Sequence, residues 1–244
     1  MKVGLFIPCY IDQFFPQAGI AAFELLKKLG CDVDYPTAQT CCGQPMANSG
    51  NEEDAKKTYK HYVRTFRDYD YIVAPSGSCT NHVRKHYDNI EQSPDVIHVR
   101  KNTLDFPEFL IDVLKIESLD AHFPYKVGLH QSCHGHRGLK LAKSSELVGE
   151  EYSKIRTLLN MVKGIELINL DRTDECCGFG GTFSVKEPEI SIKMGIDRID
   201  DHLRNKAEVI TGGDMSCLMH MQGISLRRKD KLRYMHLVEI LNHT

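Results

Sequence analysis

Cysteines are the residues of this 244-residue chain whose types and spacing could do chemistry. Eight of the nine fall into two series with the same order: a single cysteine, an adjacent pair followed by glycine, and a single cysteine with a histidine three residues later. The two series are Cys9, Cys41, Cys42 and Cys79, and then Cys133, Cys176, Cys177 and Cys217. No secretory signal is evident at the N-terminus, so we expect a cytoplasmic protein whose cysteines serve metal binding or redox chemistry rather than disulfides.

The adjacent pairs are the most informative part of each series. Neighbouring side chains on a regular strand point to opposite faces, so two adjacent thiols reach one site only from an irregular turn. Gly43 and Gly178 follow the pairs directly and supply the backbone freedom for such a turn. Four thiols and a nearby histidine per series favour an iron–sulfur cluster. A closed zinc site and buried thiols without metal remain alternatives.

The remaining cysteine and the histidines are less decisive. His82 and His220 recur at the same place in both series, so each is expected either to bind the cofactor or to support its ligands. Cys31 has no counterpart in the second series and is expected to be a small buried apolar residue. Three histidines near Cys133 are not repeated and are interpreted as polar surroundings or substrate contacts: His130, His134 and His136.

The elements around the cysteines also occur twice. Apolar, β-branched runs at Val3–Leu5 and Tyr71–Ala74 lead into Cys9 and Cys79, and matching runs precede Cys133 and Cys217. Helical patterns lie between these runs, and strands that alternate with helices predict an α/β fold with mainly parallel strands. We therefore predict two pseudo-symmetric repeats, residues 1–120 and 121–244, joined near residues 118–124.

The predicted helices have recognisable ends and faces. Pro16 is expected to open a helix that Gly30 ends. In the second repeat, helical spacing predicts one apolar face made of Ile192, Ile196, Ile199 and Leu203. The cysteine-bearing loops should gather at the carboxyl ends of the strands, where distant residues converge. Each repeat is thus expected to build a pocket of its own.

Composition excludes several functional classes. The net charge of −2 does not favour nucleic acid as a partner, and no apolar stretch is long enough to cross a bilayer. The glycines from Gly178 to Gly181 do not fit a dinucleotide-binding fingerprint. A hydride acceptor is therefore expected on a partner protein, with single electrons handled by this chain.

The doubled cysteine pattern resembles the CCG-domain iron–sulfur family, which includes subunits of heterodisulfide reductases, glycolate oxidases and lactate-utilization systems. The resemblance covers essentially the whole chain and is strongest to the lactate branch at Gln39–Pro45, Cys176–Lys186 and Cys217–His220. It implies an oxidoreductase subunit with one iron–sulfur cluster per repeat, and these clusters would be held by the eight repeated cysteines.

 In the lactate branch the resemblance implies an NAD-independent system that oxidises L-lactate to pyruvate together with other lactate-utilization subunits.

The resemblance also carries one departure. In heterodisulfide reductase relatives each repeat ends in a C-x-x-C pair, whereas His82 and His220 stand at the last position here. A cluster of 4Fe–4S type with four thiolate ligands is therefore expected. Two alternatives remain open: reduction of a disulfide substrate at the cluster, and a zinc-binding scaffold subunit.

Overall fold

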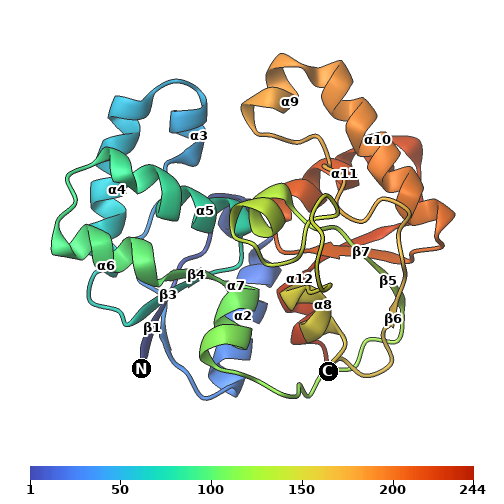
Figure 1. Cartoon of the computed structure of the whole chain (residues 1–244), viewed down its shortest axis with the longest axis horizontal. Coiled ribbons are helices and arrows are strands. Elements are labelled where there is room, and N and C mark those ends of the chain that lie inside the picture. The colour runs from blue at the N-terminus through green and yellow to red at the C-terminus, as the bar shows by residue number, and fades with distance from the viewer.

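Each half of the chain forms a four-stranded parallel sheet in the computed structural model, which describes all 244 residues (Figure 1). Sheet 1 has the order β2-β1-β3-β4, with strands Asp32–Asp34, Lys2–Leu5, Tyr71–Ala74 and Thr103–Asp105. Sheet 2 has the order β6-β5-β7-β8, with strands Glu166–Leu167, Lys126–Leu129, Val209–Gly212 and Arg233–His236. The two sheets have the same strand order, because the second, first, third and fourth strands of each half follow one another across its sheet. The predicted α/β fold of two similar repeats with parallel strands is confirmed.

Helices connect the strands of both sheets. Those of the first half are α1 Cys9–Phe14, α2 Pro16–Lys28, α3 Gln44–Asn48, α4 Glu52–Phe66, α5 Gly77–His86, α6 Pro94–Asn102 and α7 Phe106–Glu108. Those of the second half are the π-helical turn η3 His134–Gly138, α8 Lys154–Leu159, α9 Thr182–Lys186, α10 Pro188–Arg204, α11 Met215–Arg228 and α12 Leu237–Leu241. Helix α2 begins at Pro16 as predicted, and Gly30 follows its end with a φ of 77°.

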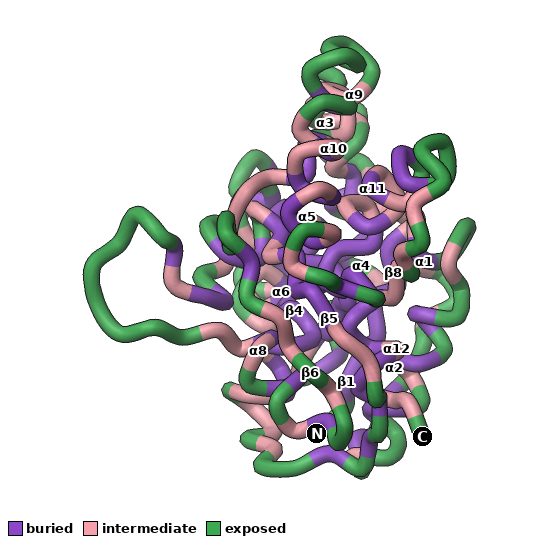
Figure 2. The backbone as a smooth tube through the Cα atoms, turned by 90° about the vertical axis from the view of Figure 1, so that its right-hand side faces the viewer, coloured by how far each residue is buried: buried purple, intermediate pink, exposed green.

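The main hydrophobic core belongs to both halves. It joins residues of sheet 1, such as Val3 and Val73, to residues of sheet 2, such as Val127 and Val209. Helix α2 packs against α12, and α8 packs against α7 and α12. The inner strands β1, β3, β5 and β7 are largely buried, whereas β6 and β8 at the edges of sheet 2 are more exposed (Figure 2). The segment expected to join the repeats contributes to this core through three buried side chains, Leu119, Ala121 and Phe123. The boundary at residues 120 and 121 stays a prediction.

A second core covers sheet 1 on its other side and is rich in aromatic residues, among them Phe6, Tyr62 and Phe66. The corresponding side of sheet 2 is different. Helix α10 buries Arg198 and His202 there, whereas Ile192 is 41% exposed. The predicted apolar face of α10 is confirmed for Ile196, Ile199 and Leu203, which pack on the main core, and is wrong for Ile192. Arg198 and His202 are buried in addition to this face.

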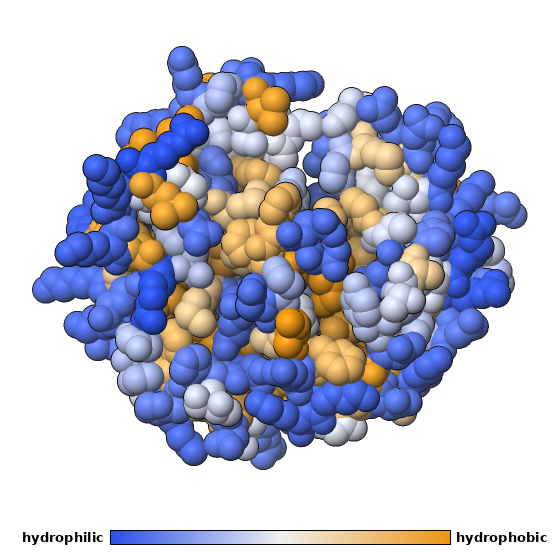
Figure 3. Space-filling view, turned by 180° about the vertical axis from the view of Figure 1, so that it is seen from behind, coloured by the Kyte–Doolittle hydropathy of each residue, from blue (hydrophilic) through white to orange (hydrophobic).

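Charged residues dominate the rim of the molecule, while apolar residues gather toward the middle of the face seen in Figure 3. No helix of the chain combines the length and the apolar character that crossing a membrane requires.

Candidate metal centre

The four repeated cysteines of the first half meet at the carboxyl edge of sheet 1. Cys9 begins α1 just after β1, and Cys79 lies in the first turn of α5 just after β3. Cys41 and Cys42 lie in the loop between β2 and α3. The Sγ atoms of Cys9 and Cys41 are 3.9 Å apart, and those of Cys42 and Cys79 are 3.4 Å apart. The structure thus brings together thiols that are up to 70 positions apart in the sequence.

The second half repeats this arrangement with Cys133, Cys176, Cys177 and Cys217. All four line the same cavity, and the sulfurs of Cys177 and Cys217 lie within 4.8 Å of one another. All nine cysteines of the chain are free thiols. Cys31, the one outside the series, is buried in the main core as predicted.

A left-handed glycine shapes the turn after each adjacent pair. Gly43 has a φ of 90° and Gly178 a φ of 86°, a conformation that side-chain-bearing residues rarely adopt. The N–H of Gly43 donates to Sγ of Cys41, and the N–H of Gly178 donates to Sγ of Cys176, each at 3.4 Å. The turn therefore aims both thiols at one site and stabilises the negative form of one of them.

Both sets of thiols open into one shared cavity of about 360 Å³ between the two halves. The expectation of a separate pocket in each repeat is wrong, because the carboxyl edges of the two sheets face each other. Residues of α3 and α9 line the cavity, and Oγ1 of Thr182 donates to the backbone carbonyl of Asn48 at 3.5 Å. Tyr10 and Phe179 also line it, and their rings meet edge to face, 5.9 Å between centroids.

Protons are unevenly shared among these thiols. Hydrogen bonds from Cys42 and Cys9 lower the pKa of Cys41, and bonds from Cys133 and Cys177 lower the pKa of Cys176. A thiol that donates such a hydrogen bond keeps its proton more tightly. Hydrogen bonds to Cys41 and Cys79 therefore raise the pKa of Cys42. Each site therefore contains one thiol that ionises more readily than its neighbours, which favours the binding of a cation.

The two repeated histidines lie behind the thiols and do not line the cavity. His82 is buried, and its Nε2 is 3.1 Å from the hydroxyl of Tyr59. Burial lowers the pKa of His82 to about 3, so its imidazole is neutral at pH 7. Nε2 of His220 is 3.2 Å from the backbone carbonyl of Ser191. These contacts favour a supporting position for both rings.

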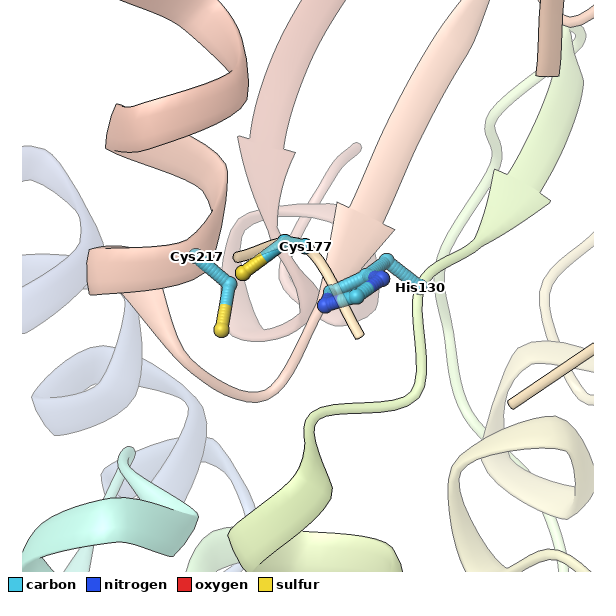
Figure 4. Close-up of side chains that lie close together, drawn as sticks. All are labelled: His130, Cys177 and Cys217. Atoms are coloured by element: carbon cyan, nitrogen blue, oxygen red, sulfur yellow. The ribbon is translucent and has the colours of Figure 1, made fainter. Parts of the chain in front are cut away.

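The three unrepeated histidines occupy different environments. His134 lines the cavity, and His136 is buried with its Nε2 3.4 Å from the carboxylate of Asp174. His130 lies closer to the thiols than the sequence predicted, because a nitrogen of its ring lies within 4.8 Å of the sulfurs of Cys177 and Cys217 (Figure 4). Its position directly after β5 was the available signal.

A carboxylate of the second half ties the site to the first half. Asp214 lines the cavity at the N-terminus of α11 and is 2% exposed. Its Oδ1 accepts hydrogen bonds of 2.8 Å from the hydroxyls of Ser76 and Ser78. These contacts hold the first turn of α5, which carries Cys79, against the first turn of α11, which carries Cys217.

Comparison with known proteins places this geometry in a family. The model of the cysteine-rich CCG domain matches residues 3–84 and again residues 127–222. The chain belongs to the cysteine-rich CCG domain family. Both family segments contain a complete series of the repeated cysteines, so the doubled site is a property of the CCG domain pair.

Relatives of this family match the chain over its full length. Lactate utilization protein A of Geobacillus thermodenitrificans is 42% identical, with 100% of this chain and 99% of the relative covered. The proteins of that name from Bacillus subtilis and Oceanobacillus iheyensis are 41% and 39% identical, each with 99% of this chain and 99% and 97% of the relative covered. Glutamate racemase RacE1 of Bacillus anthracis, a solved structure, gives a TM-score of only 0.38 at 8% identity, with 99% of this chain and 78% of that chain covered.

Proposed function

We propose that this chain is the iron–sulfur electron-transfer subunit of an NAD-independent system that oxidises L-lactate to pyruvate. The observation that carries the proposal is the convergence of eight thiols, four from each repeat, on one cavity. Full-length relatives named lactate utilization protein A support the choice of pathway. We place the protein in the cytoplasm, working with other lactate-utilization subunits.

One cluster of 4Fe–4S type per repeat fits the residues present. Cys9, Cys41, Cys42 and Cys79 would hold the first, and Cys133, Cys176, Cys177 and Cys217 the second. A structural zinc site is closed by its four ligands, whereas these thiols border an open cavity with room for a larger group. Such a cluster supplies one-electron transfer when bound. His82 and His220 would support α5 and α11, the helices that carry the ligands Cys79 and Cys217.

Lactate itself is assigned to a partner subunit. Asp214 presents a carboxylate to the cavity, which repels the carboxylate of a hydroxy acid. Oxidation of lactate also removes a hydride equivalent, and this proposal leaves its acceptance to the partner.

The size of the shared cavity favours a second candidate function, reduction of a disulfide substrate to two thiols. About 360 Å³ of space next to both sets of thiols can admit a small disulfide. Two electrons and two protons are needed for each disulfide. Turnover of small disulfides by the reduced protein alone would favour this candidate over electron transfer to a lactate-oxidising partner.

The decisive experiment is metal and sulfide analysis of anaerobically purified protein, with electron paramagnetic resonance before and after reduction. We expect a brown protein with roughly four iron and four sulfide per site, and electrons delivered to it by a lactate-oxidising partner. A colourless protein that contains zinc would instead identify a scaffold subunit and refute the proposal.

A further inference from the structure

The two cysteine sites differ in what lies behind them. After β1, Phe6 packs edge to face against Tyr62, 4.9 Å between ring centroids. After β5 the corresponding residue is His130, which contacts Arg198 of α10 instead. The first site is thus backed by aromatic rings and the second by a polar pair.

Arg198 is fully buried, although it carries a positive charge. Its Nη1 forms a 3.0 Å ion pair with Asp201, and its Nη2 donates to the backbone carbonyl of Leu129 at 3.5 Å. Its Nε donates to Nδ1 of His130 at 3.3 Å. These partners on three sides fix the guanidinium, and with it the orientation of the imidazole.

The bond from Arg198 also decides which nitrogen of His130 carries the hydrogen. A guanidinium donates hydrogen bonds and accepts none, so Nδ1 of a neutral imidazole next to it must be the acceptor. The hydrogen therefore resides on Nε2, which is buried and has no partner within the chain. Figure 4 shows the tip of the ring pointing toward the sulfurs of Cys177 and Cys217. A nitrogen that carries a hydrogen cannot bind a metal, so His130 acts as a donor rather than as a ligand.

We propose that His130, oriented by Arg198, presents the N–H of Nε2 to the sulfur atoms of a cluster bound in the second repeat and makes that cluster easier to reduce than the first. The proposal rests on the proposed function. Hydrogen bonds to sulfur and a nearby positive charge stabilise the reduced state, which carries one more negative charge. The first repeat offers only Phe6 at this place, which has no donor. Electrons shared by the two sites then collect at the second.

The test uses full-length protein carrying Cys42→Ser, which leaves only the second cluster. Reductive titration followed by electron paramagnetic resonance compares this background with the same background carrying His130→Phe or His130→Gln. We expect the Phe variant to shift the midpoint potential to a more negative value. The Gln variant should keep most of the original potential, because its amide can accept from Arg198 and still donate to sulfur.

The matched control is Phe6→Leu in a Cys177→Ser background, which exchanges one apolar side chain for another behind the first cluster and should leave its potential unchanged. The proposal would be overturned if the midpoint potential were unchanged in His130→Phe, or if it shifted as far in His130→Gln as in His130→Phe. In either case the protein would still be brown, so the proposed function would stand. A colourless, iron-free parent protein would instead refute the proposed function itself.

A second measurement needs no metal and no variant. Nitrogen-15 NMR of the imidazole rings in the metal-free wild-type protein reports the tautomer of each histidine. We expect His130 to carry its hydrogen on Nε2, and a hydrogen on Nδ1 would overturn the proposal.

Discussion

Asp214 and Ser78, which belong to different repeats, are joined through both the hydroxyl and the backbone N–H of Ser78. Oδ1 of Asp214 accepts from the hydroxyl of Ser78 at 2.8 Å, and Oδ2 accepts from its backbone N–H at 3.1 Å. The carboxylate thus caps α5 from the other half of the molecule. Because Cys79 follows Ser78 directly, this contact fixes one thiol of the first site relative to the second repeat.

Replacement of that carboxylate should loosen the contact between the halves. Asp214→Ala removes the acceptor of several buried donors, so we expect the free energy of unfolding to fall by about 2–3 kcal/mol. Urea denaturation of the metal-free protein measures the loss. Asp197→Ala, which removes an exposed ion pair with Lys193, is the matched control and should cost less than about 0.5 kcal/mol. Equal effects of the two substitutions would contradict the capping role.

Removal of single thiols should separate the two sites. Cys42→Ser and Cys177→Ser are each expected to lose about half of the bound iron, since each disrupts one four-thiol site. Cys31→Ser serves as the control, because that thiol is buried in the main core away from the cavity. Iron analysis after anaerobic purification decides the matter, and full iron in both of the first two variants would exclude the ligand assignment.

The turn after the second cysteine pair should not tolerate a side chain. A Cβ at Gly178 would lie 2.6 Å from the carbonyl oxygen of Ser191, in addition to the strain of a positive φ. Gly178→Ala should therefore destabilise the protein by about 2–4 kcal/mol and reduce its iron content. Gly50→Ala provides the control, because Gly50 also has a positive φ but open space around it. If the two variants lost equal stability, crowding at Ser191 would not be the cause.

Substitution of the repeated histidines distinguishes a ligand from a supporting residue. His82→Gln and His220→Gln should each leave the iron content unchanged, because neither ring lines the cavity and each already contacts a polar partner. Loss of half the iron in either variant would show that the histidine binds the cluster directly. The comparison is made by iron analysis alongside the cysteine variants.

Acid should destabilise the metal-free protein through His236. Nδ1 of this buried residue accepts from the N–H of Val238, and burial lowers the pKa of His236 to about 4. An unfolded histidine has a pKa near 6.5, so between these two values the unfolded state binds the proton and the folded state does not. Stability should thus fall as the pH falls from about 6.5 to about 4, at up to about 1.4 kcal/mol per pH unit for this residue.

The variant His236→Asn tests that pH dependence, because it keeps a capping side chain that does not titrate in this range. Urea denaturation at several pH values should give a shallower decline for the variant than for the wild type. Equal slopes would assign the acid sensitivity to other groups.

Sequence alone determined the repeat, the parallel α/β fold and the two sets of thiols. These features depend on local patterns, since alternating strands and helices place cysteine-bearing loops at one edge of a sheet. Gly43 and Gly178 were likewise readable, because a left-handed turn leaves a mark in the residue type itself.

Only the tertiary structure decided how the two repeats meet. The facing of the two sheet edges, which merges both sites into one cavity, and the reach of Asp214 to Ser78 depend on packing between distant segments. The same is true of the burial of Arg198 in α10. A buried charge becomes tolerable only where partners converge on it: Asp201 lies on the same helix, but His130 comes from the end of β5 and is brought there by the fold.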